Sequence, residues 1–511
     1  MTKRTPSTFL RIGIATWLLL LALAFVCRTA LISKSHITFT SDEASCLNSA
    51  LHFGSQDWQD RLYPAPRYLG GIRFWVSALF YRLTGGWLRA GAFEAILFNL
   101  LGCTLWVYWF YRWLSTKAAF VAALFLAIPP ACLDYFATLL ERRQVSFVLG
   151  AVLALGWEKW QSNARYAVLF GLLLGWAFWE DRFILAFVVS LFLGTLWAKD
   201  GKKIWKAEMW KWSILGVLLS GGYGLFREWQ QPQYGAGYLT YGFAASSAIF
   251  YRLHLLMDAF PQFWNDNMPT GLLQASALGQ AVDPMRHGSF EVGLRIWTVL
   301  LFAAALGGYG LLVLVRKGSR ALVLSALLPV VLLLFFFLLS DHVSDALCFR
   351  YFTYWPVGIA LGLGSLLEAT PEKRKKLMGI FLGLLFLIQT AIFVHRVHKI
   401  PAHHPAEQVI AALDHLGLKA GWANGWVSGA VDFISGDRIY LNQYNFEPAD
   451  RKAEWLAYHS PRIAVVSVDG LDRPELIREL LSKLENLGYH SSGGFRFKEG
   501  WTLIELRKSP T

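Results

Sequence analysis

The residues best suited to chemistry begin with two adjacent carboxylates, Asp42 and Glu43, which follow Ser41. One carboxylate of such a pair can act as a general base while the other holds a metal or orients the base. The structural alternative is a helix start, in which Ser41 caps the helix and the acids face its positive end. Both interpretations can hold together, because a helix N-terminus would also fix the carboxylates.

Two later segments place an arginine beside an apolar run. Arg182 ends the tetrapeptide that begins at Trp179, and Arg350 with Tyr351 opens another run. Guanidinium groups bind phosphate well, and a tyrosine hydroxyl adds a hydrogen-bond donor. The alternatives are a tight polar turn for Arg182 and an interface anchor for Arg350.

A third charged segment follows the break at Pro129-Pro130. Glu141, Arg142 and Arg143 stand together at the mouth of an apolar run. Charged residues at such a boundary are often interface anchors, but three on one side of a membrane favour a functional site.

The long segment 227–290 has no obvious regular structure, which is more typical of functional loops than of simple connections. Its aromatic rings offer flat faces on which a sugar could stack, with basic residues interleaved among them. The aromatic residues are Trp229, Tyr234, Tyr238, Tyr241, Tyr251, Phe263 and Trp264, and the basic ones are Arg252, His254, Arg286 and His287.

Composition predicts that a membrane positions these residues. Only 16% of the 511 residues are charged, against about a quarter in soluble proteins. Apolar runs near the ~20 residues that cross a bilayer predict a polytopic α-helical protein with about 11 spans. The predicted spans are 9–32, 91–111, 118–133, 138–157, 166–179, 183–198, 212–226, 291–315, 321–340, 350–368 and 377–394.

Basic clusters between the runs predict the orientation, with the N-terminus in the cytoplasm of a bacterial inner membrane. This threading puts the loops 33–90 and 227–290, and all residues after 394, outside the cytoplasm. It also requires Pro66 to Thr84 to lie at the interface as an amphipathic helix. The net charge of +13 is therefore attributed to basic clusters that orient the spans in the membrane, and no nucleic-acid partner is expected.

The five cysteines show no metal-binding spacing. Cys27 and Cys103 lie within apolar runs, where we expect inert packing residues. Cys46, Cys132 and Cys348 are predicted near the outer face, where a disulfide between two of them stays open.

The composition changes after Pro401, and we divide the chain into a membrane part, 1–394, and an extracytoplasmic α/β domain, 395–511. Patterning predicts helices at 406–416 and 474–487 and strands near 438–441, 462–468, 494–498 and 501–507.

Together these features resemble the GT-C superfamily of membrane glycosyltransferases, in its bacterial protein-mannosyltransferase-like and aminoarabinose-transferase-like branch. The Asp-Glu pair after the first span matches Asp42-Glu43, and the proline-containing interfacial segment matches Leu62 to Tyr68. Glu141 matches a later acidic residue, which is commonly Asp in the family, and Arg350-Tyr351 matches the opening of a late span. A lysine-containing version of the turn at Arg182 is absent here.

The resemblance implies inverting transfer of one sugar from a polyprenyl-phosphate donor to an extracytoplasmic glycan, lipid or protein acceptor. Asp42, assisted by Glu43, would be the catalytic base. Arg182, Arg350 and Tyr351 would bind the phosphate. Further contacts to the substrate would come from Arg142, Arg252 and Arg286. The alternative means of stabilising the leaving phosphate is a divalent metal held by Glu43 and Glu141. Membrane lipids complete the expected partners.

Three other functions remain open. A lipid-linked glycan polymerase or ligase would use arginine and histidine in the loop 227–290. A transporter or flippase would usually carry internal repeats and charged or broken helices at mid-membrane, whereas the ionisable residues here concentrate at the outer ends of the predicted spans. A GT-C scaffold without activity would bind its lipid without turnover.

Overall fold

The computed structural model describes most of the helices and strands of the chain. The described residues are 14–34, 50–51, 71–85, 90–128, 143–160, 163–181, 184–196, 207–230, 246–258, 289–315, 320–340, 352, 354–399, 405–436, 438–444, 451–468, 474–497 and 501–509.

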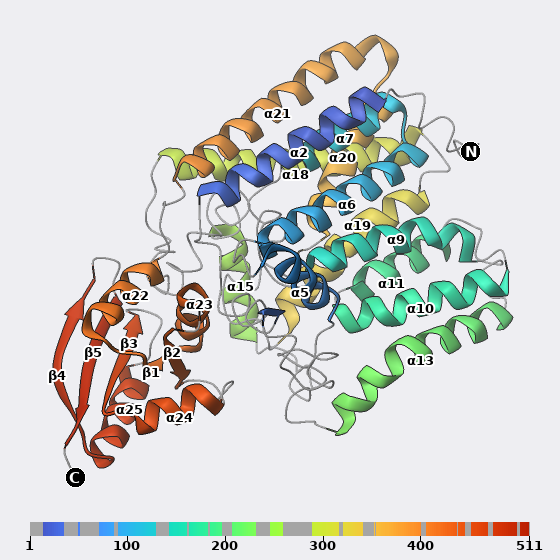
Figure 1. Ribbon diagram of the computed structural model, residues 1–511. Coiled ribbons are helices and arrows are strands. Elements are labelled where there is room, and N and C mark those ends of the chain that lie inside the picture. Colours follow the sequence, from blue (N-terminus) through green and yellow to red (C-terminus); the bar gives the residue numbers. More distant parts are fainter. Residues whose placement is uncertain are drawn as a thin grey trace.

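The first part of the chain is a bundle of helices (Figure 1). Its helices are α2 (Ile14–Lys34), α5 (Ile72–Thr84), α6 (Ala90–Trp113), α7 (Thr116–Ala127), α9 (Arg143–Trp160), α10 (Ala164–Glu180), α11 (Ile184–Thr195), α13 (Ala207–Gln230), α15 (Ser246–Asp258), α18 (Ser289–Val315), α19 (Arg320–Leu339), α20 (Trp355–Ala369) and α21 (Glu372–Lys399).

Four of these helices contain stretches long and apolar enough to cross a membrane: Phe93–Trp113, Gly293–Val315, Leu322–Leu339 and Glu372–His395. Other apolar helices in the described residues are shorter, such as the 12-residue α7. The chain is therefore a mostly helical, multi-pass membrane protein. Each of the predicted spans overlaps one of the helices, with bounds that differ by up to several residues, but the number that cross the bilayer stays a prediction.

Two helices of the bundle, α5 and α15, lie outside the predicted spans. The segment predicted to lie at the interface forms α5, whose 13 residues reach about 20 Å, too short for a ~30 Å hydrocarbon core. Its Phe74, Ser77 and Tyr81 are buried, whereas its last turn, with Arg82, is exposed. Helix α15 lies within 227–290, where we predicted no regular structure.

The strands follow the bundle in one five-stranded sheet of order β2-β1-β3-β5-β4. Strands β1 (Ala420–Ala423), β2 (Tyr440–Gln443) and β3 (Arg462–Val468) are parallel, whereas β4 (Tyr489–Arg496) and β5 (Trp501–Lys508) join antiparallel. Four helices accompany them: α22 (Pro405–Leu416), α23 (Gly425–Ser435), α24 (Arg451–His459) and α25 (Pro474–Asn486).

Alternation along β3 explains the layers of this C-terminal domain. Ala464 and Val466 pack with α22 and α23, whereas Ile463 and Val465 pack with α24 and α25. Both faces of the sheet are thus covered, as parallel strands require. The predicted elements near β2, β3, β5, α22 and α25 are present, while β1, α23 and α24 were missed and the strand predicted at 494–498 begins earlier, at Tyr489.

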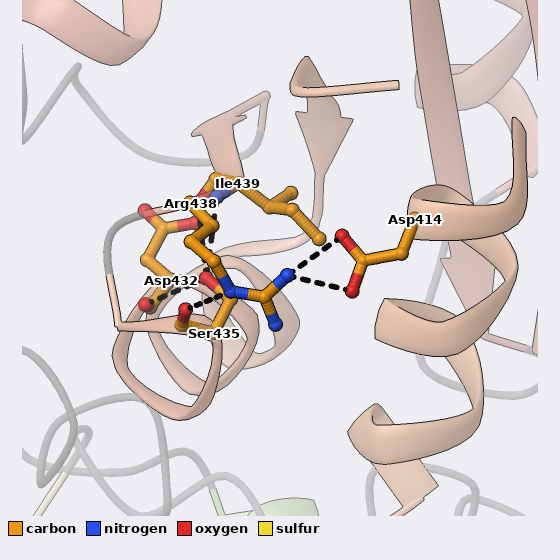
Figure 2. A network of polar contacts seen from close by, with 5 residues as sticks. All are labelled: Asp414, Asp432, Ser435, Arg438 and Ile439. Carbon is orange, nitrogen blue, oxygen red and sulfur yellow. Dashed lines mark hydrogen bonds and ion pairs between the residues drawn. The ribbon is translucent and has the colours of Figure 1, made fainter. Parts of the chain in front are cut away.

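A polar network closes the connection from α23 to β2 (Figure 2). Arg438 Nη1 donates to both carboxylate oxygens of Asp414 on α22, at 2.9 and 2.8 Å. Its Nε donates to the backbone carbonyl of Ser435, whose hydroxyl accepts from Ile439 N. Asp432 accepts from Leu441 N, which fixes β2 against α23.

The domain sits against one end of the bundle. Cys27 of α2, Ile128 after α7 and Phe393 of α21 share a hydrophobic cluster with the residues of α22, α23 and the sheet. We call this end, where α21 ends, the domain-side end (Figure 1). Cys27 and Cys103 are both buried free thiols, as predicted. The division of the chain at residues 394 and 395 stays a prediction, since α21 runs through it to Lys399.

Candidate active site at the domain-side end of the bundle

Contacts between antiparallel helices show which helix ends meet. The amide of Ser115, which caps the start of α7, donates to Glu368 near the end of α20 at 2.8 Å. Further along, a Cβ on Gly364 of α20 would come within 2.7 Å of the Ala118 carbonyl oxygen. The start of α20, at Trp355, therefore lies beside the end of α7, at the domain-side end.

A junction centred on Ser146 joins three helix ends. Ser146, near the start of α9, donates from Oγ to Asp181 Oδ2 at 2.9 Å, directly after α10. Its carbonyl accepts from the hydroxyl of Tyr354 at 3.2 Å, directly before α20. Gly150 leaves room for the Tyr354 ring, because a Cβ there would lie 2.7 Å from it. All three members of the junction are buried.

Glu180 adds the start of α5 to this region. Its carboxylate is fully buried and accepts from the backbone amide of Ile72, the first residue of α5, at 2.9 Å. A carboxylate at a helix N-terminus meets the positive end of the helix dipole, which stabilises the negative charge. Glu180 thus ties the end of α10 to α5, and Asp181 ties it to α9.

Arg28 of α2 is a positive side chain that meets the negative, C-terminal end of a helix. Its side chain is fully buried, and it donates to the carbonyls of Ala127 and Leu126, at 2.7 and 2.9 Å, where α7 ends. It also donates to Asn99 of α6 at 2.5 Å. The guanidinium therefore neutralises the negative end of α7 and joins α2, α6 and α7. The sequence carried a signal for it, a lone arginine within an apolar run, which we did not use.

The predicted site residues fall mostly outside the described residues. These are Asp42, Glu43, Glu141, Arg142, Arg182, Arg286, Arg350 and Tyr351, together with Cys46, Cys132 and Cys348. Arg252 is described: it is buried on α15, and its Nη1 donates to the Leu338 carbonyl at the end of α19, at 2.9 Å. Its role in substrate binding stays a prediction.

The neighbours in sequence of several predicted residues are nevertheless brought together. Arg182 directly follows Asp181, Arg142 lies four positions before Ser146, and Tyr351 lies three before Tyr354. Because Asp181, Ser146 and Tyr354 meet at the junction, the end of α10 and the starts of α9 and α20 lie together, while Arg182, Arg142 and Tyr351 lie outside the described residues.

No group of three potential metal ligands occurs among the residues that the structure describes. Glu43 and Glu141 lie outside them, so a divalent metal at these residues stays a prediction.

Neither a family model nor a curated protein matches the sequence, whereas solved structures do. ArnT from Cupriavidus metallidurans in the apo state aligns over 96% of this chain and 97% of its own, with a TM-score of 0.57 and 13% identity. The oligosaccharyltransferase AglB from Archaeoglobus fulgidus aligns in two structures over 88% of this chain and 69% of its own, with TM-scores of 0.50 and 0.51 and 14% identity.

The chain shares its fold with ArnT and AglB. The resemblance that rested on short motifs is thereby confirmed at the level of architecture. The match with ArnT extends over the helical bundle and the strand-containing C-terminal domain alike, since it covers nearly the whole of both chains.

Proposed function

We propose that this protein transfers a single sugar from a polyprenyl-phosphate donor to an acceptor on the extracytoplasmic face of the membrane. The observation that carries the proposal is the likeness to ArnT, an aminoarabinose transferase, over nearly the full length of both chains. One of the AglB structures is a complex with a dolichol-phosphate, which supports a lipid-linked donor in general terms.

In the proposed reaction, Asp42 accepts the proton of an acceptor hydroxyl, with Glu43 orienting it. The hydroxyl oxygen then forms a bond to the anomeric carbon while the bond from that carbon to the phosphate oxygen breaks. Polyprenyl phosphate leaves with the electron pair of the broken bond, and the anomeric configuration is inverted. A positioned carboxylate base of this kind contributes about 10²–10⁴-fold to the rate.

The leaving phosphate needs positive charge, and three predicted ligands lie within four positions in sequence of the junction residues. Arg182 follows Asp181, Arg142 precedes Ser146 by four positions, and Tyr351 precedes Tyr354 by three and follows Arg350. Guanidinium groups in a water-poor site stabilise phosphate charge strongly. Arg252 and Arg286 are proposed to contact the rest of the donor. A divalent metal held by Glu43 and Glu141 is the alternative source of positive charge at the phosphate.

A deletion strain tests the proposal. Mass spectrometry of its surface glycans should reveal one lost sugar, restored by the wild-type gene but not by Asp42→Asn. Glu372→Gln is a matched control, because it also neutralises a carboxylate, one that is exposed and paired only with Lys375 among the described residues. Unchanged glycans in the deletion strain, or full restoration by folded Asp42→Asn, would contradict the proposed reaction.

The same strain separates the alternatives. Loss of activity in Arg286→Gln with retained activity in Asp42→Asn would indicate the polymerase or ligase function. Accumulation of a complete lipid-linked glycan on the cytoplasmic side would indicate transport instead.

A further inference from the structure

Gln144, the second residue of α9, has a buried side-chain amide with no hydrogen bond to the residues that the structure describes. The residue is 0% exposed, and neither Oε1 nor Nε2 has a hydrogen-bond partner among these described residues. A buried amide without partners is costly, and the large majority of buried polar side-chain atoms in folded proteins have at least one. The amide therefore requires an explanation.

The position of Gln144 connects it with the candidate active site. It lies at the same end of α9 as Ser146, whose bonds to Asp181 and Tyr354 form the junction, but two residues along a helix place the two side chains on different faces. Phe147, three residues on, packs against Gly102 and Trp106 of α6. Gln144 is thus held on a rigid helix at the domain-side end rather than on a loop.

The chemistry of the amide limits what can bind it. Nε2 donates two hydrogen bonds, while Oε1 accepts. A phosphate diester offers acceptors alone and would leave Oε1 without a partner. A pair of hydroxyl groups, each both donor and acceptor, satisfies both ends of the amide.

On the basis of the proposed function, we infer that Gln144 binds two hydroxyl groups of the sugar that the enzyme transfers, and so selects that sugar. The sugar is the polyhydroxyl group attached directly to the phosphate of the proposed donor. Because Gln144 is enclosed, the sugar reaches it only when neighbouring side chains move. Binding of the correct hydroxyls drives that movement, and a sugar that lacks them leaves the amide unpaired, which is a strong basis for selectivity.

The substitution Gln144→Met tests this inference, because methionine matches glutamine in shape and removes both polar atoms. The thermal midpoint of the purified, ligand-free variant should rise, since an unsatisfied buried amide is gone. Transfer should fall: with donor extracted from the deletion strain, loss of two neutral hydrogen bonds lowers kcat/KM by about 10- to 100-fold. The KM for the donor should rise while that for the acceptor stays unchanged.

The matched control is Gln389→Met on α21, a second glutamine that is 2% exposed and whose Oε1 has no partner among the described atoms. Its transfer rate should equal that of the wild type. A lower thermal midpoint in Gln144→Met, or normal transfer with the donor, would overturn the inference and leave the proposed function intact. A deletion strain with unchanged glycans would overturn both.

Discussion

The bundle and the C-terminal domain stabilise their charged side chains in different ways. In the bundle, three buried charges meet helix ends: Arg28 meets the end of α7, Glu180 the start of α5, and Arg252 the end of α19. Glu368 likewise meets the amide that caps the start of α7. In each case the sign of the charge opposes the sign of the helix dipole.

The C-terminal domain instead pairs charges with each other. Arg438 binds Asp414, and Arg462 and Arg507 both bind Glu505. Water can solvate the ends of helices in such a domain, so charges there are free to pair. Within a membrane no water is available, and the polar groups at a helix end must be satisfied by protein. The difference predicts that single charges matter more in the bundle than in the domain.

The largest effect is expected for Arg28→Met. Removal of the guanidinium leaves two carbonyls of α7 and the Asn99 amide without their donor, which should cost about 3–5 kcal/mol. Thermal unfolding in detergent should show a marked fall in Tm. Arg28→Lys should recover only part of it, because an ammonium group cannot reach all these acceptors; full recovery would contradict the role of the planar guanidinium.

A smaller effect is expected at the junction. Ser146→Ala and Asp181→Asn should each lower stability, and a double-mutant cycle should give a coupling of about 1.5–3 kcal/mol for a buried hydrogen bond to a carboxylate. The same variants should slow transfer if the junction positions Arg182. Additive effects would show that the two residues act independently.

In the domain, Glu505 should contribute about 1–2 kcal/mol, and its contribution should depend on pH. Burial by itself would raise the pKa of Glu505, but hydrogen bonds from Arg462 and Arg507, and then their charges, outweigh it and hold the pKa below its ordinary value. Stability from Glu505 is therefore present above the unfolded-state pKa and lost as the pH falls through the lowered folded-state pKa. Hydrogen exchange of β3 and β5 in the full chain should show this loss, and Glu505→Gln should abolish the dependence.

The smallest effect is expected for Asp414→Asn. The ion pair with Arg438 is exposed on both sides, with 59% and 43% of the two side chains accessible, so it should contribute less than about 1 kcal/mol. Thermal unfolding with and without added salt should barely distinguish the variant from the wild type. An effect as large as that of Arg28→Met would remove the contrast between the two regions.

The sequence predicted the helices well and their ends less well. The predicted span 350–368 begins at Trp355 because Pro356 favours the first turn of a helix. The strand β1 was missed because Ala420–Ala423 contains two alanines, a glycine and a single aromatic residue, which give no alternating pattern.

Some features of the candidate site were likewise predicted from the sequence, and others were not. Apolar runs and basic clusters placed Arg142, Arg182 and Arg350 at the ends of spans, because hydrophobicity and charge act locally along the chain. Nothing in the sequence paired Asp181 with Ser146, which is 35 residues away, or Tyr354 with the Ser146 carbonyl, 208 residues away. Every residue has a backbone carbonyl, so the sequence does not show which carbonyl accepts a side-chain hydrogen bond.

By itself, then, the sequence determined that this chain is a membrane protein with a separate α/β segment and with charged residues at the ends of its spans. The tertiary structure decided which ends meet, that Arg28 and Glu180 are tied to helix termini, and that the buried amide of Gln144 has no hydrogen-bond partner among the described residues. The physical reason is that burial in a membrane follows from the local transfer energy of each segment, whereas hydrogen bonding depends on the packing of helices far apart in the chain.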